Sequence, residues 1–273
     1  MATVKGPTIG LPSGLKEQGQ RVDFREDKFI TLIETKGVRL AWSKGSVCPC
    51  ESVNQETGQP DPNCELCKGT GFLWFRPAGY VAPKDAGDLD AVQQTILLDY
   101  EAVVIRGVVV SVMTQKKSYD TLGPWALGSF EVTTRPENRL GYYDRLIALD
   151  SVLPFSELAT VDTDRVVKLR YPATCVNLVR SVAQEFLQNT DFQITKNGHL
   201  KFLPGRGPDA AVRLAVHYDH HPVLIVWEHQ HAFRDSLTAF KQPVKTTPQG
   251  NPQVLPIQSM ARLEFLPFPR DRT

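Results

Sequence analysis

Four of the chain's five cysteines lie close together as two pairs, Cys48-Pro-Cys50 and Cys64-Glu-Leu-Cys67. Two close pairs separated by a loop are typical of a four-thiolate zinc site, in which each pair holds one edge of the tetrahedron. Because four thiolates leave no open position for a substrate, the expected zinc is structural. The alternatives are four ordinary buried thiols or, in an oxidising compartment, two disulfides.

The residues around the second pair support a metal site. The run Lys68-Gly69-Thr70-Gly71 follows directly, and its glycines allow a tight turn with positive φ angles beside the metal. The loop between the pairs contains Gly58, Pro60 and Pro62 and has almost no apolar side chains. Such a loop cannot build a core of its own, so we expect the metal to hold it in place.

Histidines form a second group, because five of the six lie between residues 217 and 231. On a strand, His229 and His231 would point to the same face, and with His217 they form a candidate second metal site. The alternative is that His220-His221-Pro222 forms a polar corner and the other histidines line a surface or a subunit contact. The sequence has no HExxH motif.

No motif of a known catalytic class accompanies these residues. The sequence lacks the G-x-S-x-G nucleophile motif and the G-x-x-x-x-G-K-[ST] phosphate loop. Asp85, Asp88 and Asp90 lie close together without a calcium-loop pattern, which predicts a solvated acidic loop. We therefore expect a protein that is not an enzyme.

Charge and hydropathy restrict the possible partners. The chain has 31 Lys and Arg residues against 30 Asp and Glu residues, a net charge of +1. Sequence-independent binding to nucleic acid needs a concentrated basic face, so a zinc-ribbon nucleic-acid-binding protein is only an alternative. We expect no secretory leader, because Met-Ala-Thr-Val-Lys-Gly-Pro leads into a Gly/Pro-rich stretch rather than an apolar core. We also expect no membrane-spanning run, because the apolar stretch from Ala102 to Met113 is short and contains Arg106. The isolated Cys175 is predicted to be a buried, inert thiol.

Short alternating runs predict a mainly β fold, with β-barrel or sandwich-like domains, few short helices, a zinc-ribbon-like module and extended N- and C-terminal arms. A helix is expected over about 24–36, capped by Asp23 and ended by Gly37, and a second short helix over 174–187. Asn197-Gly198 predicts a hairpin. Further strands are expected at 38–42, within 95–150, at 212–218 and at 223–227.

Five segments follow from this pattern. They are an extended arm at 1–22, a helix, strand and cysteine module at 23–80, a β-rich barrel-like domain at 81–160, a second β-rich region at 161–241, and a proline-rich arm at 242–273. Because prolines cannot donate ladder hydrogen bonds, the last segment is expected to contribute no central strand.

The order of motifs resembles virion proteins of tailed bacteriophages, of the kind found at the neck between head and tail. The resemblance rests on four stretches: Phe29 to Trp42 leading into Cys48-Pro-Cys50, Glu56-Thr57-Gly58-Gln59-Pro60-Asp61-Pro62-Asn63-Cys64 continuing to Cys67-Lys68-Gly69-Thr70-Gly71, Tyr143-Asp144-Arg145, and Val216-His217-Tyr218 with His221-Pro222 and His231-Ala232-Phe233-Arg234-Asp235. The cysteine segment is the specific part, and the Cys64–Gly71 unit is also similar to zinc modules of co-chaperones.

This resemblance implies a head–tail connector or neck protein with a structural zinc ion at Cys48, Cys50, Cys64 and Cys67. Such a protein is made in the cytoplasm of the bacterial host and ends in the virion. It would self-associate into a ring, contact portal and tail proteins, and let packaged DNA pass without sequence-specific binding or contact with a membrane. A tail or baseplate structural protein is the nearest alternative.

Overall fold

The computed structural model describes residues 26–50, 52–54, 59–111, 128–231, 235–237, 252–254 and 257–265. Its helices are α1 (Glu26–Lys36) and α2 (Ala91–Asp99). The strands are β1 (Val38–Val47), β2 (Ser52–Asn54), β3 (Gln59–Pro60), β4 (Phe72–Phe75), β5 (Val103–Ser111), β6 (Ser129–Thr134), β7 (Arg145–Ala148), β8 (Leu153–Thr160), β9 (Val166–Val167), β10 (Ala173–Arg180), β11 (Glu185–Phe186), β12 (Phe192–Ile194), β13 (Leu200–Phe202), β14 (Arg213–His220), β15 (Val223–His231), β16 (Asp235–Leu237), β17 (Pro252–Val254) and β18 (Ile257–Leu263).

Six antiparallel strands form a closed barrel in the order β1-β5-β6-β18-β15-β7, and a pairing of β7 with β1 closes it. Side chains alternate along β1, so that Leu40 and Trp42 lie in the barrel core while Ala41 lies in a second apolar cluster outside it. The mainly β fold with a barrel and a four-cysteine cluster is therefore confirmed.

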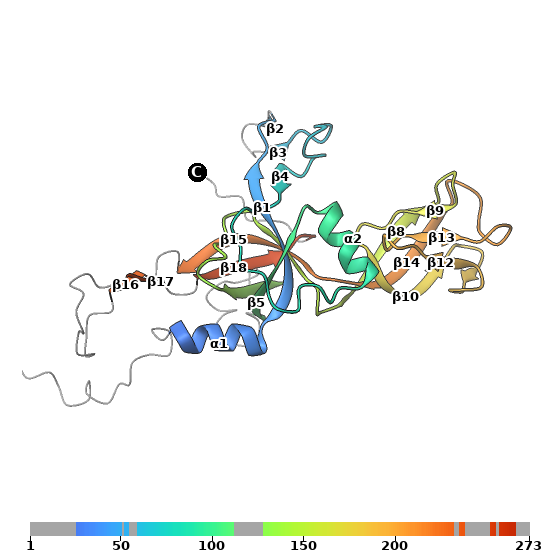
Figure 1. Cartoon of the computed structure of the whole chain (residues 1–273). Coiled ribbons are helices and arrows are strands. Elements are labelled where there is room, and N and C mark those ends of the chain that lie inside the picture. The colour runs from blue at the N-terminus through green and yellow to red at the C-terminus, as the bar shows by residue number, and fades with distance from the viewer. Residues whose placement is uncertain are drawn as a thin grey trace, which may run out of the picture.

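A second β unit, the distal domain, lies to the right of the barrel in Figure 1. It contains a four-stranded sheet, β11-β10-β14-β8, and a three-stranded sheet, β12-β13-β9. The Asn-Gly hairpin is confirmed as β12 and β13, with Phe192 opposite Phe202 and Gly198 at φ 71°. The strands expected at 212–218 and 223–227 are confirmed as β14 and β15, which carry the chain from the distal domain into the barrel.

Helix α1 confirms the first predicted helix, and the N–H of Gly37 donates to the carbonyl of Ile33 at its end. Asp23, the expected cap, lies outside the described residues. Helix α2 replaces part of the expected β region. Its Asp90 accepts a hydrogen bond from the N–H of Gln93, whose side chain accepts from the Asp90 N–H in return, a capping box.

Two local predictions are wrong. Residues 174–187 are not helical, because the β-branched Thr174, Val176 and Val179 lie in or beside β10, which pairs with β14. Residues 242–273 do contribute a central strand, since β18 pairs with both β15 and β6. The run Ile257–Leu263 contains no proline, so its full ladder can form. Most of the two expected arms lies outside the described residues.

Along the chain, the barrel takes strands from four of the predicted segments, 23–80, 81–160, 161–241 and 242–273. Within the described residues, no helix is long and apolar enough to cross a membrane.

Candidate metal centre

The four cysteines come together in a module that extends from the end of β1 and includes β2, β3 and β4 (Figure 1). Their Sγ atoms all lie within 4.8 Å of one another, and the Cys48–Cys64 and Cys50–Cys67 separations are both 3.8 Å. A metal with metal–sulfur bonds of about 2.3 Å places tetrahedral sulfurs about 3.8 Å apart. The four side chains are therefore close enough, and suitably spaced, to bind one metal ion.

The backbone after the second pair wraps around the sulfurs. Lys68, Gly69 and Gly71 have φ angles of 50°, 81° and 80°. The φ of Gly69 favours glycine, and a Cβ added there would also make a tight contact, 3.1 Å from the Cα of Pro62. The N–H of Cys48 donates to the carbonyl of Gly71, which joins the two cysteine pairs through the backbone.

Acid–base properties of the thiols differ within the cluster. Burial raises the pKa of Cys48 to about 12. Burial also acts to raise the pKa of Cys67, but hydrogen bonds from the backbone N–H groups of Gly71 and Gly69 favour its thiolate, and the pKa falls to about 7. Ionising the whole set together needs a positive charge at its centre, which a divalent metal supplies.

Three aromatic and polar contacts attach the module to the barrel. Phe72 stacks on Tyr143 with ring centroids 4.6 Å apart, and the Trp74 indole N–H donates to the Tyr143 carbonyl at 3.0 Å. The guanidinium of Arg145 lies between the rings of Trp74 and Tyr100, at 4.2 and 4.3 Å from their centroids. Burial lowers the pKa of Arg145.

Asp144 is fully buried beneath these contacts and organises the base of the module. Its carboxylate accepts hydrogen bonds from the Trp42 indole and from the N–H groups of Gly45 and Gly141, at 2.7 to 2.9 Å, and Lys44 lies 3.5 Å away. A Cβ on Gly45 would lie 2.1 Å from the Tyr143 carbonyl oxygen. The ribbon of β1 and β4 is thus held in one orientation on the barrel.

The candidate second metal site is distributed over two sheets. His217 lies on β14 of the distal domain, where its Nδ1 is 2.6 Å from the hydroxyl of Ser156. His229 lies on β15 of the barrel, where its Nδ1 is 2.9 Å from the hydroxyl of Ser259. A register shift separates His229 from His231, whose side chain lies outside the described set. Among the described residues, the four cysteines form the one group of three or more potential ligands within reach of an ion.

Other predicted sites have structural partners. Asp85 forms an ion pair with Arg106, the backbone carbonyl of Asp88 accepts a hydrogen bond from Arg39, and Asp90 caps α2. The acidic loop, which was expected to be solvated, therefore makes specific contacts within the protein. Cys175 is exposed rather than buried, because its side chain lies on the outer face of β10. The ion pairs of Arg39 and Arg106 are not predictable from local sequence, since their partners are distant in the chain.

No protein-family model and no curated protein sequence matches this chain.

Proposed function

We propose that the protein is a structural component of a tailed-bacteriophage virion, a head–tail connector or neck protein that forms a ring around the DNA channel. The proposal rests on the resemblance of its cysteine segment and motif order to such proteins. The observation that best supports it is the closed barrel with a firmly attached cysteine module and a separate distal domain (Figure 1). A protein of this build offers several fixed surfaces to neighbours.

The metal in this proposal is a structural zinc ion. Zinc accepts a tetrahedron of four thiolates without preference for another geometry, and its binding energy stabilises a loop that has little apolar surface. The exposed Leu66 lies between Cys64 and Cys67, so the ion would also fix an exposed apolar side chain that a neighbouring subunit could contact.

The Ser156–His217 pair, a serine next to a histidine, is compatible with a role that is not enzymatic. Ser156 and His217 are in hydrogen-bond contact beside a surface hollow of about 320 Å³. They face each other across two paired strands, and among the described residues the His217 ring has the Ser156 hydroxyl, not a carboxylate, as its hydrogen-bond partner. A nucleophile and base without an orienting group or an oxyanion site is a poor catalyst. We interpret the pair as a cross-strand contact.

A nearly neutral net charge suits the proposed position in a ring around the DNA channel. Because the net charge is +1, DNA would meet no strong positive field and could slide through a ring of these subunits. The same property argues against the zinc-ribbon nucleic-acid-binding alternative.

The test is to determine whether the protein forms rings and where it lies in the particle. Purified protein, alone and mixed with portal complexes, is measured by mass photometry and imaged by negative-stain electron microscopy, and virions are labelled with antibody against the protein. The proposal expects a closed ring or a portal-bound complex, with label at the head–tail junction. Label at the tail tip would favour the tail or baseplate alternative. A strict monomer that is absent from virions would refute a virion role.

Metal identity is tested separately. Plasma mass spectrometry of the purified protein is expected to find about one zinc per chain, because the cluster offers one closed four-ligand site. Tight DNA binding that weakens steeply with salt would instead support the nucleic-acid-binding alternative.

A further inference from the structure

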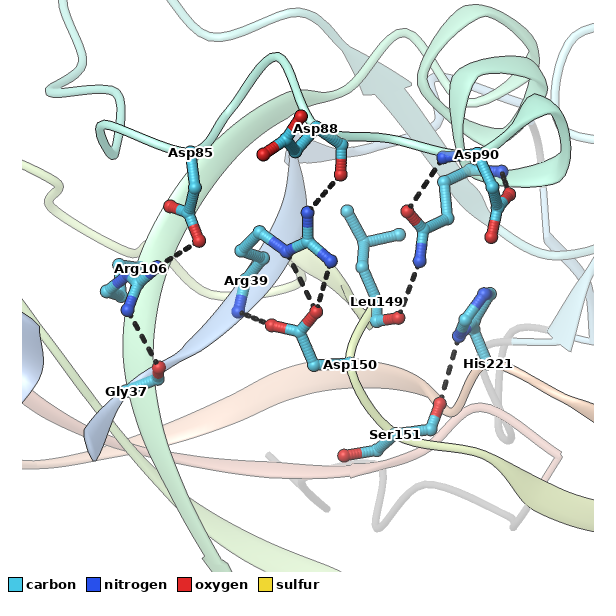
Figure 2. Close-up of polar contacts among 11 residues, drawn as sticks. Gly37, Arg39, Asp85, Asp88, Asp90, Arg106, Leu149, Asp150, Ser151 and His221 are labelled. Carbon is cyan, nitrogen blue, oxygen red and sulfur yellow. Dashed lines mark hydrogen bonds and ion pairs between the residues drawn. The ribbon is translucent and has the colours of Figure 1, made fainter. Parts of the chain in front are cut away.

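The barrel and the distal domain are joined by a turn, residues 148–151, that contacts several elements (Figure 2). Asp150 accepts hydrogen bonds from the backbone N–H and the side chain of Arg39 on β1, at 2.5 to 2.8 Å. The side chain of Gln93 on α2 donates to the carbonyl of Leu149 at 2.9 Å. We call this turn the junction turn.

The crossover from β14 to β15 contacts the junction turn directly. The ring Nδ1 of His221 lies 2.9 Å from the carbonyl oxygen of Ser151, a contact drawn in Figure 2. The N–H of Ala148 donates to the carbonyl of Pro222. The ring Nδ1 of His220 lies 2.7 Å from the carbonyl oxygen of His221. Two adjacent histidines therefore hold the crossover.

These contacts determine the tautomer of both rings. A carbonyl oxygen only accepts, so each Nδ1 must carry the proton and donate it. In the neutral ring, Nε2 then has no proton. The Nε2 atoms of His220 and His221 are both buried and lack a hydrogen-bond partner among the described residues. Only 1% of His220 and 5% of His221 is exposed.

The surroundings of His220 are aromatic. Its ring stacks on Tyr171 at a centroid distance of 4.4 Å and an interplanar angle of 11°, and it makes a T-shaped contact with Phe155 at a centroid distance of 5.6 Å. A proton added at Nε2 would create a charged N–H donor in this pocket with no acceptor. Burial lowers the pKa of His220, and a charge on neighbouring His221 lowers it further.

The charged groups around the pair are mostly engaged elsewhere. Asp219 on β14, whose charge favours protonation of His220, accepts a hydrogen bond from Asn177. Glu157 on β8 accepts hydrogen bonds from the Tyr218 hydroxyl and the Arg170 N–H, and Asp150 is paired with Arg39.

The tyrosines next to the pair carry no charge. The negative charge of Glu264, which follows β18, raises the pKa of Tyr171, and the guanidinium of Arg170 lies over the Tyr171 ring. Burial keeps the pKa of Tyr171 and of Tyr218 high, so both remain neutral.

We propose that the His220–His221 crossover is an acid-sensitive latch between the barrel and the distal domain, with His220 as its titrating group. With His220 neutral, the crossover is held against the junction turn and the two domains keep a fixed orientation. Protonation of His220 places an unpartnered charge in the pocket and releases the crossover. The latch depends on no feature of the proposed virion role.

The sign of the effect follows from linkage. A histidine whose pKa is lower when folded than its unfolded value of about 6.5 binds fewer protons in the folded state. Stability of the junction is therefore full above about pH 6.5 and decreases as pH falls toward the folded pKa. Asp150 does not cause the same loss in this window, because its hydrogen bonds from Arg39 outweigh burial and lower its pKa.

The test combines two measurements on the whole chain. Nitrogen-15 NMR of histidine-labelled protein at pH 7.5 is expected to show His220 neutral with its proton on Nδ1. Hydrogen exchange of residues 148–156 and 217–226, corrected for the intrinsic pH dependence, is expected to accelerate as pH falls from 7 to 5, because the folded state binds fewer protons than the unfolded state.

Three variants separate the latch from general acid sensitivity. The double variant H220N/H221N keeps the two hydrogen-bond donors, because asparagine places an amide N–H near the Nδ1 position, but it cannot titrate. The variant H220F keeps the aromatic stack on Tyr171 and has no ring nitrogen to protonate. Both are expected to lose most of the acceleration. His217→Asn, on the same strand but partly exposed, is expected to retain it. Acceleration that persists in both latch variants, or a ring with its proton on Nε2 at pH 7.5, would overturn the proposal.

Discussion

The cysteine ligands are the residues on which the module depends most directly. We expect Cys64→Ser to abolish binding of the proposed metal and to lower the hydrogen-exchange protection of residues 45–50 and 59–72, because the loop between the pairs has too few apolar side chains to build a core of its own. The barrel and distal domain should keep their protection. The control is Cys175→Ser, which changes an exposed thiol outside the cluster. Equal protection of residues 45–50 and 59–72 in both variants would contradict a structural role for the proposed metal.

Two glycines provide a second comparison at this scale. Gly45→Ala is expected to destabilise the protein by about 2–4 kcal/mol, since the new Cβ overlaps the Tyr143 carbonyl oxygen and the backbone must shift. Gly87→Ala is the matched control, because a Cβ there meets nothing within 4 Å. Urea unfolding monitored by circular dichroism measures both. Similar midpoints for the two variants would mean that the β1–β4 ribbon is not fixed as described.

Among the secondary-structure elements, the Arg39–Asp150 pair ties β1 to the junction turn. We expect Asp150→Asn to lower the free energy of unfolding by about 1.5–3 kcal/mol at pH 7, the range for hydrogen bonds to charged groups. The pair is partly buried, with 15% and 31% of the side chains exposed. Lys168→Met is the control, since its pair with Asp162 is mostly exposed and should contribute about 0–1 kcal/mol.

The same variant has a defined pH dependence. The folded pKa of Asp150 is lowered, so its contribution is present above the unfolded value of about 3.9 and is lost as pH falls through the folded pKa. The difference between wild type and Asp150→Asn should therefore shrink at pH 3, as measured by urea midpoints. A difference that stays constant from pH 7 to pH 3 would show that the charge on Asp150 is not what stabilises the turn.

Local pattern predicted those elements whose own residues decide their conformation. The Asn197-Gly198 turn, the alternation along β14 and the four-cysteine cluster all depend on residues close in sequence. Helix α2 was missed because its capping residue, Asp90, resembles one more member of an acidic loop until Gln93 completes the box. Strand β18 was missed because flanking prolines dominate its segment, while its place in the barrel depends on strands far away in sequence.

Prediction of the sites was also limited to residues that lie close together in sequence. The cysteines could be grouped by spacing, but the Asp144 carboxylate at the base of the module acts through Trp42 and Gly45, about a hundred residues earlier. The histidine group looked like one site because its members are near in sequence. The chain passes from the distal domain into the barrel between His217 and His229, and so places them in different sheets.

For the molecule as a whole, one apolar cluster joins the barrel and the distal domain. It contains Ala41, Val104 and Ile147 on the outside of the barrel, Ile96 of α2, and residues of both distal sheets such as Val216 and Phe192. Cooperativity follows from shared burial, because unfolding one domain would expose the apolar surface of the other. We therefore expect a single unfolding transition for barrel and distal domain.

Ile96→Ala tests this coupling. Ile96 is 1% exposed, so the substitution should cost about 2–5 kcal/mol, and the loss should appear equally in both domains. Leu98→Ala on the same helix is the control, because Leu98 is 77% exposed and should change stability by less than about 0.5 kcal/mol. Hydrogen exchange at increasing urea concentration, followed for β5 and for β14, resolves the two domains. If β14 loses protection at a lower urea concentration than β5 in the wild-type protein, the shared cluster does not couple them. If both transitions coincide and move together in Ile96→Ala, the cluster around α2 makes the barrel and the distal domain one cooperative unit.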